Sequence, residues 1–359
     1  MFQKIEVIIK SERIDYMVTY YPILRHADAE MNAYKSLKSS TQKLITPIIE
    51  GKRISKNSKN TWDKTLNSSG KYLKERIGSQ LFIYDFRNMF DNLQNYTTEI
   101  KKDNINPVEF IINKFNQFNL NFIPCINHDS PDWLIKSITT SSSKTVAIRI
   151  RYYDLQTTLH DLVNSHVEAI INKHFANSKV SLILDFREKL EDSNLSSNIR
   201  YFSDKNLDKL ILSTTTLDTK KDVDKMSFKK VSNRQEISLY NTLKQGFPNI
   251  LFSDYTTRLT PEPDLKTGFN MNNSYLKIYY TTNKGYYLGK SNKFDEGEPE
   301  NFQKLCNIIT NSSLYSGETY SEGDRLIKRC SLKFEEVLSH KKTIEMSINH
   351  HLEFTVNQL

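Results

Sequence analysis

Two apolar runs in separate parts of the sequence end with the same three residues, Asp-Phe-Arg. The first run ends in Asp85 and Arg87, and the second ends in Asp185 and Arg187. Residues two apart in a strand point to the same side, so each aspartate is predicted to pair with the arginine that follows it. Carboxylates transfer protons or bind hard cations, and guanidiniums bind phosphate through paired hydrogen bonds. The two endings therefore indicate a site for a phosphorylated ligand.

The elements that must position these residues are strands buried on both faces, as in a parallel sheet. Eight such strands are predicted, at 20–25, 44–50, 81–87, 121–126, 145–151, 180–188, 209–215 and 249–255. Helices are predicted at 28–37, 61–78, 107–118, 131–138, 154–175, 197–207, 218–226 and 233–245. This alternation is typical of a (β/α)8 TIM-barrel-like fold of the α/β class. The alternative, an open doubly wound sheet, usually has a glycine-rich phosphate loop, and Gly51 stands alone after an early strand.

The pattern changes after residue 258. Strands at 275–282 and 286–290 flank the turn 283–285 and predict a β-hairpin that caps one mouth of the barrel. Tyrosines beside that turn predict either stacking on bases or cross-strand pairing, and they are Tyr279, Tyr280, Tyr286 and Tyr287. Helices are predicted near 299–311 and 321–338, a leading strand or short helix at 1–19, and mixed signals at 345–359. We expect a barrel over 1–258 and a packed hairpin and helical extension over 259–359, within one structural domain overall.

Composition limits the class of protein. The chain has 359 residues, of which 38% are hydrophobic, so it can bury a large core. We expect no membrane span and no signal peptide, since charged residues interrupt every apolar run and the first twenty positions. Cys125, Cys306 and Cys330 form no CxxC pair, which predicts reduced thiols in a cytoplasm. The net charge of +8 permits an anionic partner such as a nucleotide or nucleic acid without requiring one.

The active sites of barrels lie at the C-terminal ends of the strands. The predicted catalytic residues there are Glu50, Asp85, Asp185, Asp254 and His128, and the predicted substrate-binding residues are Arg25, Arg87, Arg149, Arg151, Arg187 and Arg258. Such a ring suits a phosphorylated, nucleotide or nucleic-acid substrate, and its carboxylates suit a divalent metal. The alternative is a structural ring in which carboxylates and guanidiniums neutralise one another. The enzyme hypothesis fails if Asp85 and Asp185 are saturated by ion pairs in a closed mouth.

Short motifs at both ends of the chain and at the eighth strand are similar to those of one family. They are Tyr20-Tyr-Pro-Ile-Leu-Arg25, Ile45-Thr-Pro-Ile-Ile-Glu50, Ser253-Asp-Tyr-Thr256, Asn349-His-His-Leu352 and the closing Gln358-Leu359. Together they resemble the phage-type "beta protein" family over nearly the whole chain. The resemblance implies a phage- or defence-linked setting and supplies no reaction.

The resemblance also implies that the terminal segment returns to the barrel, so that His350 or His351 reaches the mouth as a substrate-binding residue. The alternative is a packed C-terminal strand with one histidine hydrogen-bonded. A second hypothesis for the whole chain is a non-catalytic interaction protein in phage–host conflict. Its partner is then a protein from a neighbouring gene, and the barrel is a scaffold.

Overall fold

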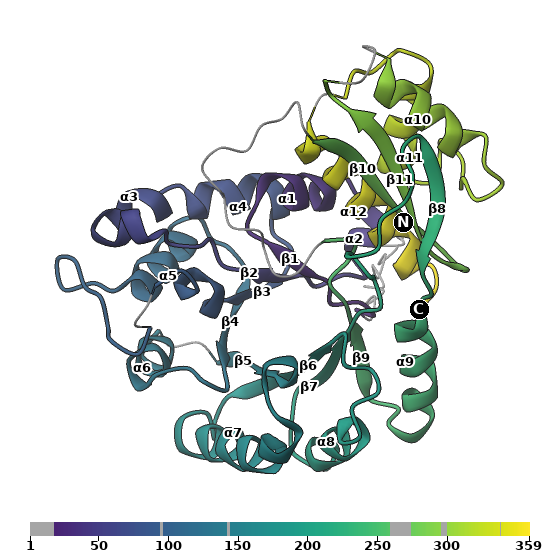
Figure 1. The fold of residues 1–359 in the computed structure, drawn as a ribbon. Helices are drawn as coiled ribbons and strands as arrows, with labels where there is room; N and C mark the ends of the chain where they lie inside the picture. The colour runs from purple at the N-terminus through teal and green to yellow at the C-terminus, as the bar shows by residue number, and fades with distance from the viewer. Residues whose placement is uncertain (1–17, 94–95, 142–143, 259–273, 296–299, 338) are drawn as a thin grey trace, which may run out of the picture.

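The computed structural model describes residues 18–93, 96–141, 144–258, 274–295, 300–337 and 339–359 (Figure 1). The leading strand or helix predicted at 1–19 falls on residues 1–17, outside this part of the chain.

Eight parallel strands form one sheet in the order β1-β2-β3-β4-β5-β6-β7-β9. The strands are β1 (Ile23–Arg25), β2 (Ile48–Glu50), β3 (Phe82–Asp85), β4 (Phe122–Asn127), β5 (Thr145–Arg151), β6 (Lys179–Arg187), β7 (Lys209–Thr214) and β9 (Ile250–Ser253). The first and last strands meet, because the Tyr21 N–H donates to Phe252 O at 2.9 Å and the Ile23 N–H to Asp254 O at 2.8 Å. The sheet thus curls into a nearly closed barrel, and the predicted (β/α)8-like fold is confirmed.

Helices surround the barrel (Figure 1). They are α1 (Asp28–Lys35), α2 (Ser39–Gln42), α3 (Trp62–Leu66), α4 (Ser69–Ile77), α5 (Pro107–Gln117), α6 (Asp132–Thr140), α7 (His160–His174), α8 (Leu195–Ser203) and α9 (Gln235–Gly246). Helix α5 begins where the sequence predicts, because Asn106 and Glu109 form a capping box and Pro107 occupies the first turn. The helix predicted over 61–78 is divided into α3 and α4.

Apolar residues form two layers around the strands. The inner layer fills the barrel and consists of Tyr21, Ile23, Ile48, Ile83, Ile123, Cys125, Ala147, Ile183, Ile211 and Tyr255. The larger outer layer lies between strands and helices and includes Leu182 and Leu184 of β6. Alternate residues of a strand thus enter opposite layers, which explains why the strands are almost continuously apolar.

A small antiparallel sheet lies beside the barrel in the order β10-β11-β8. Its elements are β8 (Ser227–Ser232), β10 (Tyr275–Thr282) and β11 (Gly285–Lys293), followed by α10 (Asn301–Thr310), α11 (Glu322–Ser331) and α12 (His340–Val356). The predicted hairpin is confirmed as β10 and β11. The helix predicted at 218–226 is wrong, because the chain here leaves the barrel so that β8 can pair with β11. The small sheet therefore takes strands from both sides of residue 258.

Helix α12 resolves the mixed signals at the end of the sequence. It packs between α1 and β10, in the position of an eighth barrel helix (Figure 1). Its Ile348 and Leu352 belong to the outer core layer. The hairpin was expected over a mouth of the barrel; instead β10 lies against α12, beside the barrel, because this helix needs an apolar cover on its outer side.

Two smaller predictions concern membranes and thiols. Within the described residues, the helices lack the combined length and hydrophobicity that crossing a membrane requires. All three cysteines are buried and unbridged.

Candidate functional site at the barrel mouth

Each of the eight barrel strands places one polar side chain inside the barrel near its C-terminal end. In each strand the residue two positions earlier is apolar and either belongs to the inner layer or packs against that layer. Because residues two apart share a side of a strand, each of these polar side chains points inward. They are Arg25, Glu50, Asp85, Asn127, Arg149, Asp185, Ser213 and Ser253, all of them buried. This polar layer is the floor of the mouth at which barrel active sites lie.

Arg149 is the centre of the polar layer and is fully buried. Its Nε and Nη2 donate to Asp185 Oδ2 at 2.9 and 2.7 Å. Its Nη1 donates to Asp85 Oδ2 at 2.7 Å and to Glu50 Oε1 at 3.2 Å. The Tyr255 hydroxyl accepts from Nη2 at 2.6 Å and donates to Asp185 Oδ2 at 2.6 Å. One guanidinium therefore engages carboxylates from three different strands.

The surroundings of Asp85 keep it ionised. Burial alone would raise the pKa of Asp85, but the Arg149 and Arg151 guanidiniums lower that pKa overall. Asn127 Nδ2 and the Arg87 backbone N–H donate to the other oxygen, Oδ1, at 2.8 and 3.0 Å. Both oxygens of this carboxylate are thus occupied by donors. The arrangement matches the structural ring more closely than a proton-transferring site.

The two predicted Asp–Arg side-chain pairs are wrong. Strand β3 ends at Asp85 and a 3-10 helix begins at Arg87, whose side chain turns to Asp91 and Asp129 at 2.6 and 3.1 Å. In β6 the register shifts between Asp185 and Arg187, and Asp185 pairs with Arg149 while Arg187 stacks on Tyr153. Alternation holds only within a regular strand, and both arginines lie where it stops.

Arg187 has an unusual backbone conformation. Its φ is +49°, in the left-handed region that residues with a Cβ atom seldom adopt. The bulge turns its guanidinium onto the ring of Tyr153, 3.7 Å from the ring centre, and toward Tyr255 at 5.3 Å. Thr256, just after β9, has a φ of +55°, which is rarer still for a β-branched residue. Backbone strain of this kind clusters at functional sites.

Five guanidiniums and five carboxylates of the described residues lie in the polar layer or at its rim. They are those of Arg25, Arg149, Arg151, Arg187 and Arg258, and those of Glu30, Glu50, Asp85, Asp185 and Glu188. Arg258 Nη1 binds Glu30 Oε1 at 2.7 Å, and Arg151 Nη2 lies 3.6 Å from Asp85 Oδ2. The ion-pair partner of Arg187 is exposed Glu188, at 3.9 Å. Arg187 is therefore held less closely than Arg149 or Arg258.

His128 lies at the rim of the mouth beside Arg151. Its Nδ1 accepts from the Arg151 backbone N–H at 3.3 Å. Burial lowers the pKa of His128, which favours its neutral form. His128 thus contacts the backbone of β5, since its own backbone N–H also donates to Arg149 O at 3.0 Å.

Asp254, His350 and His351 were expected at the mouth, and the structure places them outside the barrel wall. His351 Nε2 lies 2.9 Å from Asp254 Oδ2, and the Tyr20 hydroxyl donates to Asp254 Oδ1 at 2.5 Å. His350 pairs with Asp324 of α11 at 2.8 Å. Asp254 follows Phe252 on the outward side of β9, while α12 carries both histidines past that side. These residues join α12 to its neighbours and do not face the mouth.

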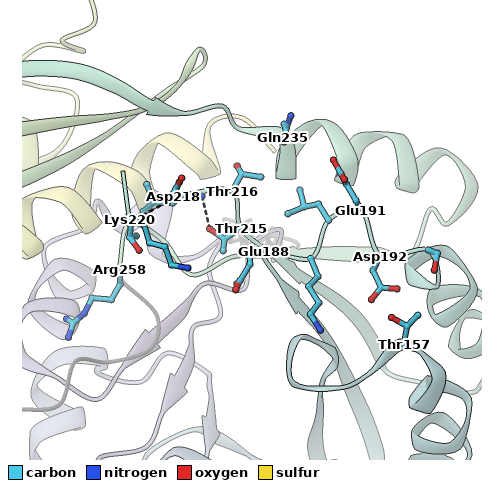
Figure 2. A pocket seen from close by; sticks show the side chains of 15 residues that line it. Thr157, Glu188, Glu191, Asp192, Thr215, Thr216, Asp218, Lys220, Gln235 and Arg258 are labelled. Atoms are coloured by element: carbon cyan, nitrogen blue, oxygen red, sulfur yellow. Dashed lines mark hydrogen bonds between the residues drawn. The ribbon is translucent and has the colours of Figure 1, made fainter. Parts of the chain in front are cut away.

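A hollow of about 830 Å³ opens at the C-terminal ends of β6 and β7 (Figure 2). We call it the mouth hollow, and its lining is Thr157, Glu188, Lys189, Leu190, Glu191, Asp192, Ser193, Thr215, Thr216, Leu217, Asp218, Thr219, Lys220, Gln235 and Arg258. Figure 2 shows Arg258 at one end and Thr157 at the other. Of the predicted residues only Arg258 lines it. The run Thr214-Thr-Thr216 was the signal that sequence reasoning missed, since hydroxyls at a strand end can bind a ligand.

The predicted metal site finds no support in the geometry. Among the residues that the structure describes, no three histidine, cysteine, aspartate or glutamate side chains gather as metal ligands would. The predicted ligands Asp85, Asp185 and Glu50 all contact Arg149.

Fold and site together define a (β/α)8-like barrel with a self-neutralised polar layer and an arginine-bearing rim. The chain belongs to the Beta protein family, whose model matches residues 20–357. A comparison with curated proteins gives no match.

Proposed function

We propose that this chain is a cytoplasmic protein that binds a phosphate-bearing ligand at the barrel mouth through Arg187. The observation that carries the proposal is the strained backbone of Arg187, which holds a guanidinium at the rim with exposed Glu188, 3.9 Å away, as its ion-pair partner. Burial would lower the pKa of Arg187, but Tyr255, Tyr153 and Asp185 raise it overall, so its charge is retained. Guanidiniums bind phosphate oxygens in pairs.

Two buried threonine hydroxyls lie near Arg187 in the fold. Thr214 is paired with Arg187 in the sheet register and Thr256 follows Tyr255, and both hydroxyls are buried with no hydrogen-bond partner among the described residues. The Thr215 N–H donates to Arg187 O at 2.8 Å, which ties the end of β7 to the bulge. Buried polar groups without partners are uncommon, and a bound ligand or water satisfies them. Hydroxyls and a guanidinium together suit phosphate oxygens.

The proposal is for binding rather than acid–base catalysis. Asp85 is buried with donors on both oxygens, whereas Asp185 Oδ1 is buried without a hydrogen-bond partner among the described residues. Asp85 is thus saturated, which favours the interaction-protein hypothesis, with the ligand as its signal. The phage- or defence-linked setting and a protein partner from a neighbouring gene stay predictions.

The test is calorimetric titration with inorganic pyrophosphate. Arg187→Gln removes this guanidinium and should weaken binding about 10- to 100-fold, since a charge-assisted hydrogen bond contributes about 1.5–3 kcal/mol. Arg200→Gln, on the exposed face of α8, is the matched control and should leave the affinity unchanged. Equal binding by Arg187→Gln and the unmodified protein, or no binding by either, would rule the proposal out.

A further inference from the structure

A second pocket lies beside the mouth hollow, between the end of β9, β10 and α12. This side pocket has a volume of about 340 Å³ and is lined by Thr219, Thr257, Arg258, Ser274, Tyr275, Lys277, Tyr279, His340, Thr343, Ile344 and Ser347. Thr219 and Arg258 also line the mouth hollow, so the two spaces adjoin. In Figure 2, Arg258 marks the end of the mouth hollow at which they meet.

The walls of the side pocket suit a planar ring with polar edges. Tyr275, Tyr279 and Ile344 supply aromatic and apolar surface. Thr257 is only 4% exposed, and its hydroxyl has no hydrogen-bond partner among the described residues. A mostly apolar pocket of a few hundred Å³ with a small number of polar groups is the usual form of a small-molecule site.

The charge of the side pocket differs from that of the mouth hollow. Its lining, as far as the structure describes it, holds the cations Arg258 and Lys277 and no carboxylate. The mouth hollow is lined by four carboxylates, those of Glu188, Glu191, Asp192 and Asp218. Both cations are paired outside the lining, Lys277 with Asp222 at 3.2 Å and Arg258 with Glu30 at 2.7 Å. Arg258 lines both spaces and is the guanidinium at their junction.

We propose that the ligand of the mouth is a nucleoside phosphate, an inference that rests on the function proposed above. Its base would enter the side pocket against Tyr275 and Ile344, with its polar edge toward the Thr257 hydroxyl. Its phosphates would pass Arg258 and reach Arg187. The adjoining spaces thus divide the ligand into an aromatic part and an anionic part.

The experiment compares pyrophosphate with ATP, GTP, CTP and UTP by calorimetric titration of the full chain. We expect at least one nucleotide to bind 10-fold or more tightly than pyrophosphate. Ile344→Trp fills the side pocket and should reduce nucleotide affinity to the pyrophosphate level, while pyrophosphate binding is unchanged. Leu162→Trp, on an exposed position of α7, is the control and should change neither affinity. Tyr275→Ala removes one wall of the side pocket, and it replaces Ile344→Trp in the test if Ile344→Trp fails to fold.

The outcomes separate this inference from the proposed function. Nucleotides that bind no more tightly than pyrophosphate, or that bind equally well to Ile344→Trp and Tyr275→Ala, overturn the side-pocket assignment alone. Nucleotide binding that depends on Ile344 but not on Arg187 supports the side pocket and overturns the mouth as the phosphate site. Both proposals are supported if Ile344→Trp and Arg187→Gln each weaken nucleotide binding and only Arg187→Gln weakens pyrophosphate binding.

Discussion

Arg149 and Asp185 meet in the middle of the barrel, where two guanidinium nitrogens donate to a single carboxylate oxygen at 2.9 and 2.7 Å. The pair is fully buried. Charges this deep are costly unless they are paired, and Arg149 also engages Asp85 and Glu50. The polar layer is therefore interdependent: removal of Arg149 takes the paired cation from Asp185 and leaves Asp85 and Glu50 with only the more distant Arg151 and Arg25. This makes its stability sensitive to single substitutions.

Arg149→Met tests that interdependence. We expect a loss of about 3–5 kcal/mol in the free energy of unfolding at pH 7, because the substitution leaves buried carboxylates unpaired. Unpaired buried carboxylates have raised pKa values, so in the variant they take up protons as the pH falls. In the unmodified protein the pKa of Asp85 is lowered, and its contribution is lost on acidification. The difference between the two proteins should therefore shrink from pH 7 toward about pH 4. Urea unfolding at several pH values measures it.

Arg200→Met, on exposed α8, is the control for Arg149→Met and should change stability by no more than about 0.5 kcal/mol. A loss below about 1 kcal/mol for Arg149→Met, or one that does not change with pH, would mean that water or rearrangement satisfies the carboxylates.

Local sequence patterns were sufficient to predict the barrel and the hairpin, but not β8, the third strand of the small sheet. A run such as Leu182–Leu184 is apolar because it is buried on both faces, so its own residues identify it as a strand. Strand β8 has the sequence Ser-Phe-Lys-Lys-Val-Ser, in which only Val231 is buried. This segment forms a strand because it pairs with β11, which lies far away in the chain. The local hydrophobic pattern of the segment therefore does not predict a strand.

The sequence predicted which charged residues lie at the mouth, but not which of them form ion pairs with one another. The strand-end rule brought Glu50, Asp85, Arg149 and Asp185 together correctly, because parallel strands end on one side of the barrel. Which carboxylate meets which guanidinium depends on the stagger of the strands and on the bulge at Arg187. Those features are set by the closed barrel as a whole. Sequence spacing therefore could not identify Arg149 as the central cation.

Asp324→Asn tests the attachment of α12. Burial would raise the pKa of Asp324, but His350, Ser321 and Tyr280 lower it overall. A carboxylate with a lowered folded pKa contributes stability above its unfolded pKa of about 3.9, and this contribution is lost as the pH falls through the folded value. We expect Asp324→Asn to cost about 3 kcal/mol at pH 7 and progressively less below about pH 4. Urea midpoints across this range measure the difference. Exposed Asp204→Asn is the control, and a constant cost at all pH values would contradict the prediction.

Thr256→Gly and Thr257→Gly form a matched pair for the strained backbone. Both threonines are buried and both hydroxyls lack a partner among the described residues, but only Thr256 has a positive φ. Glycine adopts that conformation without strain, so Thr256→Gly regains about 1–3 kcal/mol that Thr257→Gly does not. We expect Thr257→Gly to be the less stable variant by about 1–2 kcal/mol in urea unfolding. Equal stabilities would show that the left-handed turn stores no strain.

Gly323→Ala and Gly246→Ala compare two helical glycines with different surroundings. A Cβ atom at Gly323 of α11 would lie 2.3 Å from Met346 O and 3.2 Å from the His350 backbone nitrogen, both on α12. The two helix backbones would have to separate, which costs about 1–3 kcal/mol. A Cβ at Gly246, the last residue of α9, meets nothing within 4 Å. There we expect no loss, or a gain of up to about 1 kcal/mol. Thermal unfolding of both variants checks this, and a Gly323→Ala protein that melts at or above the temperature of Gly246→Ala would show that α11 and α12 are not in close contact.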